Sequence, residues 1–260
     1  MYLTRNQAYR KVTGVRIPPS PPLPPYESSH PLRWLFCWLF GAGRVSTLTR
    51  TVHTTRKQMT DSIDSPSALR RIYAAAKGRS VAKQIDHLDA HCKRFIALSP
   101  FVVLASANAQ GDPDASPRGG APGFVHVVDE HTLLIPDSPG NNRLDSLSNL
   151  AETGKIGLLF MIPGVDETLR VNGQARLAAD QATLLPFAAD ARIRLAIEVA
   201  VVDAYLHCAK ALMRSKLWNS EHQVDRSVLP SVGEMLADQT ATPALPETRE
   251  QMLARYACDL

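Results

Sequence analysis

Short apolar runs separated by polar turns dominate the chain between residues 99 and 202. Runs of this length, rich in Val, Ile, Leu and Phe, are typical of β-strands. They predict six strands, at residues 101–105, 124–128, 132–135, 156–162, 167–177 and 192–202. Strands and helices do not alternate regularly, which counts against a doubly wound sheet. The pattern therefore predicts an antiparallel β-barrel with helices mainly at its ends.

Two helices are predicted ahead of the strands. Ser65 followed by Pro66 is a typical N-cap and first helical residue, and Gly78 is a natural stop. A second helix is predicted from Ser80 to just before Pro100, because its apolar residues recur every three or four positions. The residues of this buried stripe are Val81, Ile85, Leu88, Cys92, Phe95 and Ile96.

Further helices are predicted after the third, fifth and sixth strands. The first begins at Asn141 or Asn142 and places Leu144, Leu147 and Leu150 on its inner face. The others are expected at residues 180–187 and 207–218, and the tail beyond them contains two short helical pieces.

Residues 1–58 have a different character from the rest of the chain. The Pro-rich stretch at 15–25 allows only polyproline or coil, and the longest apolar run, Trp34 to Phe40, is too short to span a bilayer. We interpret 1–58 as a disordered or mis-annotated extension, with Met59 as the real start.

The expected organisation of the chain then has three further parts. Residues 59–98 form N-terminal helices, 99–218 form the barrel with its C-terminal helix, and 219–260 form a tail. The positive charge lies in residues 1–58, which hold many Arg and Lys and only one acid, Glu27, so the formal charge of +4 does not argue for nucleic-acid binding. The four cysteines are widely spaced, which favours a reducing cytoplasm.

Metal and nucleophile chemistry have little support in the sequence. His87 and His91 are four residues apart, but no third ligand is evident, so no metal site is expected. His207 and Cys208 are neighbours on a predicted helix, where adjacent side chains point about 100° apart and do not form a dyad. Cys208 is therefore expected to be a buried small apolar residue.

Two polar segments that each carry an Arg interrupt the strands, at residues 116–120 and 137–143. Arg143 is expected at a helix start, where free N–H groups favour an anion, and Gly119 lets a ligand approach the backbone. Guanidinium groups suit phosphate oxygens. These segments predict a site for a phosphate-containing cofactor. The glycines at 119, 120 and 123 lack the strand–turn–helix context of a dinucleotide fingerprint.

An ordered series of motifs between Ser65 and Trp218 resembles the FMN-binding split-barrel flavoproteins of the pyridoxamine 5′-phosphate oxidase-like superfamily, in a bacterial branch without an assigned substrate. The motifs are SPFVVL at 99–104, DASPRG at 114–119, APGFV at 121–125, LIPD at 134–137, GNNRLDS at 140–146, ETLRVNG at 167–173 and HCAKA at 207–211.

The resemblance implies a six-stranded antiparallel Greek-key split barrel and a homodimer with FMN at the subunit interface. It implies flavin contacts from Ser116, Pro117, Arg118, Gly119, Ile135, Pro136, Asp137, Ser138, Glu167 and Thr168. Asn142 and Arg143 match the phosphate segment. It also implies that the partner subunit supplies His207, Lys210, Arg214 and Trp218.

The function implied is that of an FMN-dependent oxidoreductase acting on a small molecule. The family's true pyridoxamine phosphate oxidases carry Arg-Lys at the phosphate segment, where this chain has Asn142-Arg143, so vitamin B6 oxidation is not expected. The residues leave the catalytic acid and base unassigned. The alternatives are a non-catalytic flavin or haem binder and a deazaflavin-dependent reductase on the same barrel.

Overall fold

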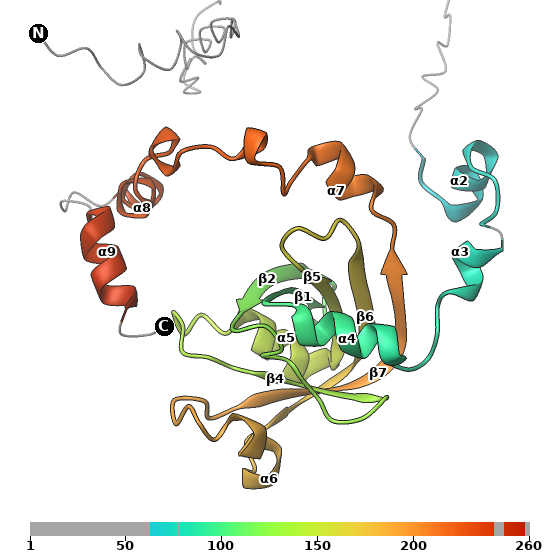
Figure 1. The fold of residues 1–260 in the computed structure, drawn as a ribbon, viewed down its shortest axis with the longest axis horizontal. Helices are drawn as coiled ribbons and strands as arrows, with labels where there is room; N and C mark the ends of the chain where they lie inside the picture. Colours follow the sequence, from blue (N-terminus) through green and yellow to red (C-terminus); the bar gives the residue numbers. More distant parts are fainter. Residues whose placement is uncertain (1–62, 77, 242–246, 258–260) are drawn as a thin grey trace, which may run out of the picture. The chain divides into compact units, whose positions relative to one another are not determined.

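The computed structural model describes residues 63–76, 78–241 and 247–257. The prediction for residues 1–58 lies outside the described residues. Seven strands form one antiparallel sheet in the described part of the chain (Figure 1). They are β1 (Phe101–Ala107), β2 (Pro113–Gly119), β3 (His126–Val127), β4 (Thr132–Pro136), β5 (Lys155–Met161), β6 (Thr168–Ala178) and β7 (Ala196–His207).

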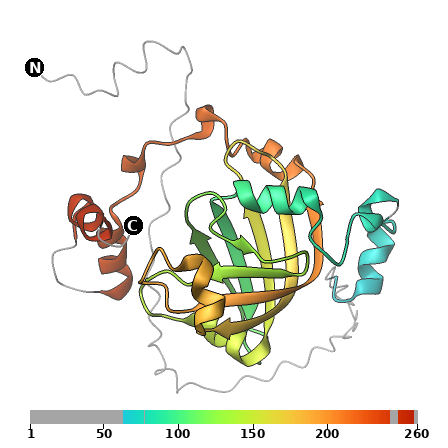
Figure 2. The ribbon, with the colours of Figure 1, turned by 60° about the horizontal axis from the view of Figure 1, so that its bottom comes forward.

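The strand order is β2-β1-β5-β6-β7-β4-β3. Strands β5, β6 and β7 form a meander, and β4 returns beside β7, which is a Greek-key arrangement. The sheet curls strongly round its core (Figure 2), but its edge strands β2 and β3 do not pair with each other. The antiparallel sheet with flanking helices is therefore confirmed, whereas the predicted six-stranded barrel is corrected, because the sheet has seven strands and is not closed.

The seventh strand is β2, which the apolar pattern did not predict because its sequence, PDASPRG, contains no large apolar residue. It pairs only with β1, with Pro117 opposite Val103. An edge strand tolerates proline, since one side of its backbone needs no partner.

The core is built from the inward-facing residues of the central strands. Val102, Leu104, Phe160 and Val171 have no exposed surface. Helices α4 (Ala90–Leu98) and α5 (Asp145–Thr153) lie across opposite ends of the curled sheet (Figure 2). Together these elements produce one continuous apolar cluster that supports the sheet from inside.

The long helix predicted from Ser80 onward is wrong. The structure has α2 (Pro66–Ile72), a short α3 (Arg79–Ala82) and then α4, which begins where the Asp89 carboxylate accepts from the Cys92 N–H at 2.7 Å. Between α3 and α4, Ile85 forms a β-bridge with Ala204. The predicted stripe is buried only from Leu88 onward, because that is where the chain packs on the core.

The last strand and the helix after it also differ from the prediction. Strand β7 begins at Ala196 and ends at His207, so His207 is not helical. Helix α7 (Lys210–Ser215) is shorter than the predicted 207–218. The loop between β6 and β7 contains α6 (Gln181–Leu184) and the 3₁₀ helix η1 (Leu185–Phe187).

The tail contains two short 3₁₀ helices, η2 (Ser220–His222) and η3 (Arg226–Val228), and two α-helices, α8 (Val232–Thr240) and α9 (Arg249–Tyr256). Both α-helices begin with a capping box, from Ser231 with Glu234 and from Thr248 with Gln251. The two predicted helical pieces of the tail are therefore confirmed. No helix within the described ranges is long and apolar enough to cross a membrane.

Candidate functional site

A cavity of about 600 Å³ opens beside β2 and is bounded by the segment between β4 and α5 and by the residues just before β7. This volume is within the usual range of small-molecule sites. Nine of the predicted site residues line it. They are Ser116, Pro117, Arg118, Gly119, Pro136, Asp137, Ser138, Asn142 and Arg143.

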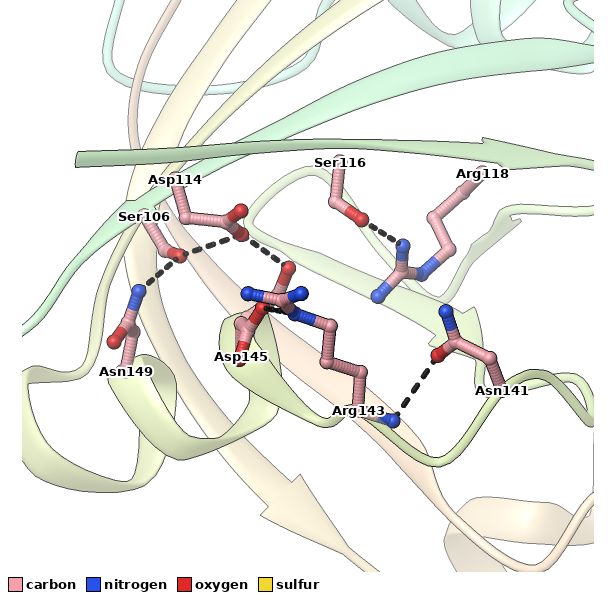
Figure 3. A network of polar contacts seen from close by, with 9 residues as sticks. Ser106, Asp114, Ser116, Arg118, Asn141, Arg143, Asp145 and Asn149 are labelled. Atoms are coloured by element: carbon pink, nitrogen blue, oxygen red, sulfur yellow. Dashed lines mark hydrogen bonds and ion pairs between the residues drawn. The ribbon is translucent and has the colours of Figure 1, made fainter. Parts of the chain in front are cut away.

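Strand β2 supplies one wall of this cavity through alternate residues. Asp114, Ser116 and Arg118 face the inner side of the sheet, opposite Ser106, Leu104 and Val102 of β1. The Arg118 Nη1 donates to Ser116 Oγ at 2.7 Å and to the Pro117 carbonyl at 2.9 Å (Figure 3). Both acceptors are neutral, so the half-buried guanidinium is oriented without having its charge neutralised.

Of the two glycines after Arg118, Gly120 is the one whose missing side chain is required by packing. A Cβ on Gly120 would lie 2.7 Å from the Phe124 Cβ, which is closer than atoms can pack. Gly120 therefore makes room for Phe124, a cavity residue that the sequence analysis missed. A Cβ on Gly119 would make only ordinary contact, at 3.5 Å from the Pro100 carbonyl oxygen.

The segment leading into α5 is sharply bent. Asn142 and Leu144 have φ angles of 57° and 60°, in the left-handed region that non-glycine residues rarely adopt. Strain of this kind costs about 1–3 kcal/mol per residue and is concentrated at functional sites. The Arg143 N–H donates to Asn141 Oδ1 at 3.0 Å, which helps to hold the bend.

Arg143 does not lie in the first turn of the helix as predicted. Helix α5 begins at Asp145, and the Arg143 guanidinium is ion-paired with the carboxylate of Asp145. That pairing raises the pKa of Arg143. The side chain is 77% exposed. The expected helix-dipole environment of Arg143 is therefore wrong, because the left-handed Leu144 delays the helix.

A polar network joins β1, β2 and α5 at the floor of the cavity (Figure 3). The Asp114 carboxylate accepts from Ser146 Oγ at 2.5 Å and from Ser106 Oγ at 3.4 Å. The Asn149 amide in turn donates to Ser106 Oγ at 3.1 Å. Ser106 and Ser146 are both buried, so these bonds fix the helix start relative to the edge strand.

The cavity wall carries charges of both signs. The sequence analysis missed Asp114, Arg192 and Arg194, although alternation along β2 and the Arg-x-Arg spacing before β7 are visible signals. Arg192 forms an ion pair with Asp190. Burial raises the pKa of the Asp137 carboxyl, and the positive charge of Arg118 partly opposes that rise.

Seven predicted site residues do not line this cavity. Ile135 is fully buried in the core, and its side chain is inaccessible. The others are Glu167, Thr168, His207, Lys210, Arg214 and Trp218. Thr168 is opposite His207 at one end of the β6–β7 pair, whereas Ala196, at the other end of β7, is opposite Pro136 beside the cavity. An extended strand rises ~3.3 Å per residue, so the two ends of β7 are about 36 Å apart along it.

Other candidate groups also lie away from the cavity. His126 lines a smaller cavity of about 350 Å³ between α4 and the β3 region. Trp218 Nε1 donates to the Val165 carbonyl at 2.9 Å. Cys208 is exposed, contrary to the burial expected for an apolar cysteine. Among the described residues, no group of three or more His, Cys, Asp or Glu side chains is arranged to hold a metal ion.

Comparison with known proteins gives one family match. Residues 88–208 match the family model described as pyridoxamine 5′-phosphate oxidase. No curated protein sequence matches the chain significantly. The matched segment includes the cavity residues of β2 and the loop before α5, and also the far end of β7.

Several solved structures resemble this one at low sequence identity. HupZ of Group A Streptococcus is 16% identical, and the match covers 45% of this chain and 90% of the HupZ chain, with a TM-score of 0.38. An FMN-binding protein of Syntrophomonas wolfei is 12% identical, covers 44% and 81%, and has a TM-score of 0.35. An F420 reductase is 14% identical, covers 44% and 94%, and has a TM-score of 0.32. Scores this low decide nothing about cofactor or activity.

Proposed function

Residues 88–208 belong to the pyridoxamine 5′-phosphate oxidase-like superfamily, and on this premise we propose that the chain is an FMN-dependent oxidoreductase. The observation that carries the proposal is the cavity beside β2, where nine residues expected to touch the cofactor lie together. Its substrate is expected to differ from pyridoxamine phosphate, because Asn142-Arg143 replaces the Arg-Lys pair of the family's vitamin B6 enzymes.

The cavity residues fit a flavin phosphate. Arg118 is half-buried, held by neutral acceptors, and available to an anion through its remaining N–H groups. The bent segment at Asn142 and Arg143 would bring further donors to the same cavity. Arg118 is the better principal ligand, since the guanidinium of Arg143 is already paired with Asp145.

A bound flavin would supply hydride or electron transfer, while the chain supplies binding, orientation and electrostatics. Arg118 would fix the phosphate and so set the position of the ring. The Asp114 network would keep the start of α5 in place beneath it. Phe124 and Pro136 would exclude water from part of the cavity wall.

We propose further that two copies of the chain complete the site. Glu167, Thr168, His207, Lys210, Arg214 and Trp218 are at the far end of β6 and β7 from the cavity of their own chain. A two-fold arrangement would let this end of one subunit face the cavity of its partner. In the dimer these residues would contact the cofactor, whereas within a single chain they lie away from the cavity.

The visible absorption spectrum of the purified full chain, with and without added FMN, tests the proposal. Flavin bands that remain after gel filtration are expected, together with oxidation of a reduced nicotinamide when an acceptor is supplied. A Soret band would indicate haem, and retention of deazaflavin but not FMN would indicate the other reductase class. A colourless protein that retains none of these would overturn the proposal.

A further inference from the structure

A cationic cluster lies at the end of β6 and β7 that is remote from the cavity. Lys83, Arg170, Tyr205 and His207 form it. The Lys83 Nζ is 5.2 Å from the centre of the Tyr205 ring, and the Arg170 Cζ is 5.6 Å from it. The rings of Tyr205 and His207 are 5.1 Å apart, so three side chains gather round this one tyrosine.

The backbone and neutral groups hold both cations in place. Lys83 Nζ donates to the Leu206 carbonyl at 2.6 Å, and Arg170 Nη1 donates to the Tyr205 hydroxyl at 3.0 Å. The bridge between Ile85 and Ala204 fixes the segment that carries Lys83 against β7. The cluster is therefore built from two separate parts of the chain and is not a chance meeting of flexible side chains.

The cluster has an excess of positive charge. None of the ion pairs formed by the described residues involves Lys83 or Arg170. The nearest carboxylate along β7, Asp203, accepts instead from the Asn172 amide at 3.0 Å. Two cations beside one ring without a counter-ion attract an anion, and more strongly where solvent is partly excluded.

His207 provides an independent sign of a ligand. Its Nε2 is buried and has no hydrogen-bond partner among the described residues. Burial, together with the positive charges of Arg170 and Lys83, lowers its pKa. A neutral imidazole can donate from one ring nitrogen, and buried polar atoms are normally satisfied.

We propose that Lys83, Arg170 and His207 bind one carboxylate or phosphate group of a small-molecule ligand, with Tyr205 as the surface that holds the two cations apart. This site lies at the opposite end of β7 from the flavin cavity of the same chain, and in the dimer proposed above it would face the flavin cavity of the partner. Binding of the anion does not require the flavin, so the two proposals can fail separately.

The test uses the full chain with ¹⁵N-labelled histidine and follows the ring nitrogens by NMR during titration with inorganic phosphate and, separately, acetate. His207 is assigned from a His207→Gln sample. A saturable shift of the His207 signal is expected with at least one of the two anions. The anion that binds more tightly shows whether the ligand group is a phosphate or a carboxylate. Lys83→Gln should weaken binding about tenfold or more, since a hydrogen bond to a charged group is lost.

Two variants control for the net charge and for the cavity. Lys155→Gln removes the same charge from an exposed position on β5 and should leave the titration unchanged. Arg118→Gln should also leave it unchanged. The proposal is overturned if His207 does not respond to either anion, if Lys155→Gln weakens binding as much as Lys83→Gln, or if only Arg118→Gln weakens it.

Discussion

The cavity beside β2 and the far end of β6 and β7 differ in how the chain assembles them. The cavity collects residues mainly from one stretch, 114–147, through a hairpin edge and a bent loop. The far end collects residues that are distant in sequence, with Lys83 lying 123 residues from Leu206. The first is a partly open cavity, whereas the second is a cationic cluster at the other end of the same strands. In the proposed dimer these two regions would be the two halves of one site, which a single chain does not bring together.

The largest effect is expected from Arg118→Gln. The change removes a cavity guanidinium that neutral acceptors hold in position, so FMN affinity should fall about 100-fold. Fluorescence quenching of added FMN measures the dissociation constant.

The matched control for Arg118 is Arg176→Gln. Arg176 is on β6, is paired with Glu198 and is 61% exposed. FMN affinity should be unchanged in this variant. An equal loss in both variants would mean that overall charge, and not the cavity, attracts the cofactor.

The sequence predicts most of what lies near the cavity because local rules determine it. Six of the seven strands follow from apolar runs, and the Arg118 segment stands out as a polar interruption. Strand β2 escapes the pattern, because an edge strand that lines a polar cavity needs no large apolar residue. Such a strand is recognised only from its partner β1.

The errors arise where tertiary contacts override local preference. Residues 80–87 continue a helical apolar pattern, but Ile85 pairs with Ala204 and the Asp89 cap restarts the helix. Leu144 takes a left-handed conformation that no propensity favours, which moves Arg143 out of the helix. The cluster round Tyr205 also could not be predicted, because Lys83 and Arg170 are distant in sequence and come to lie beside Tyr205 only when their segments pair with β7.

The second prediction concerns how rigid the floor of the cavity is. Asp114→Ala leaves the buried hydroxyls of Ser106 and Ser146 without their acceptor, so the free energy of unfolding should fall by about 1.5–3 kcal/mol. Urea denaturation measures this change. Asp112→Ala, in the exposed turn before β2, should change it by no more than about 0.5 kcal/mol. Equal effects would show that the network does not hold α5 to the sheet.

The third prediction asks whether the two halves meet across a dimer. An Arg118→Gln chain lacks a working cavity, and a Lys210→Ala/Arg214→Ala chain lacks the cations of α7. Unfolding and refolding the two together should yield about half mixed dimers, each with one intact site. About a quarter of the sites should then bind FMN with wild-type affinity. If the mixture binds no more FMN than the separate variants, then either both halves of the site lie within one chain or α7 is not part of the site.

The smallest effect is expected at Asp137, because the carboxylate of this cavity residue would repel the negatively charged phosphate of the flavin. Burial raises the pKa of this carboxyl, so its ionised form is disfavoured in the folded chain and persists only above that raised pKa. At pH values above that raised pKa the negative charge should repel a flavin phosphate, and Asp137→Asn should bind FMN about threefold more tightly. As the pH falls through the raised pKa, wild-type Asp137 takes up a proton and the difference should disappear.

Asp238→Asn, on the exposed surface of α8, should show no gain at any pH. A loss of affinity in Asp137→Asn would instead mean that the carboxylate accepts a hydrogen bond from the flavin. The cavity would then hold the ring at Asp137 and the phosphate at Arg118, and one chain would contact both ends of the cofactor.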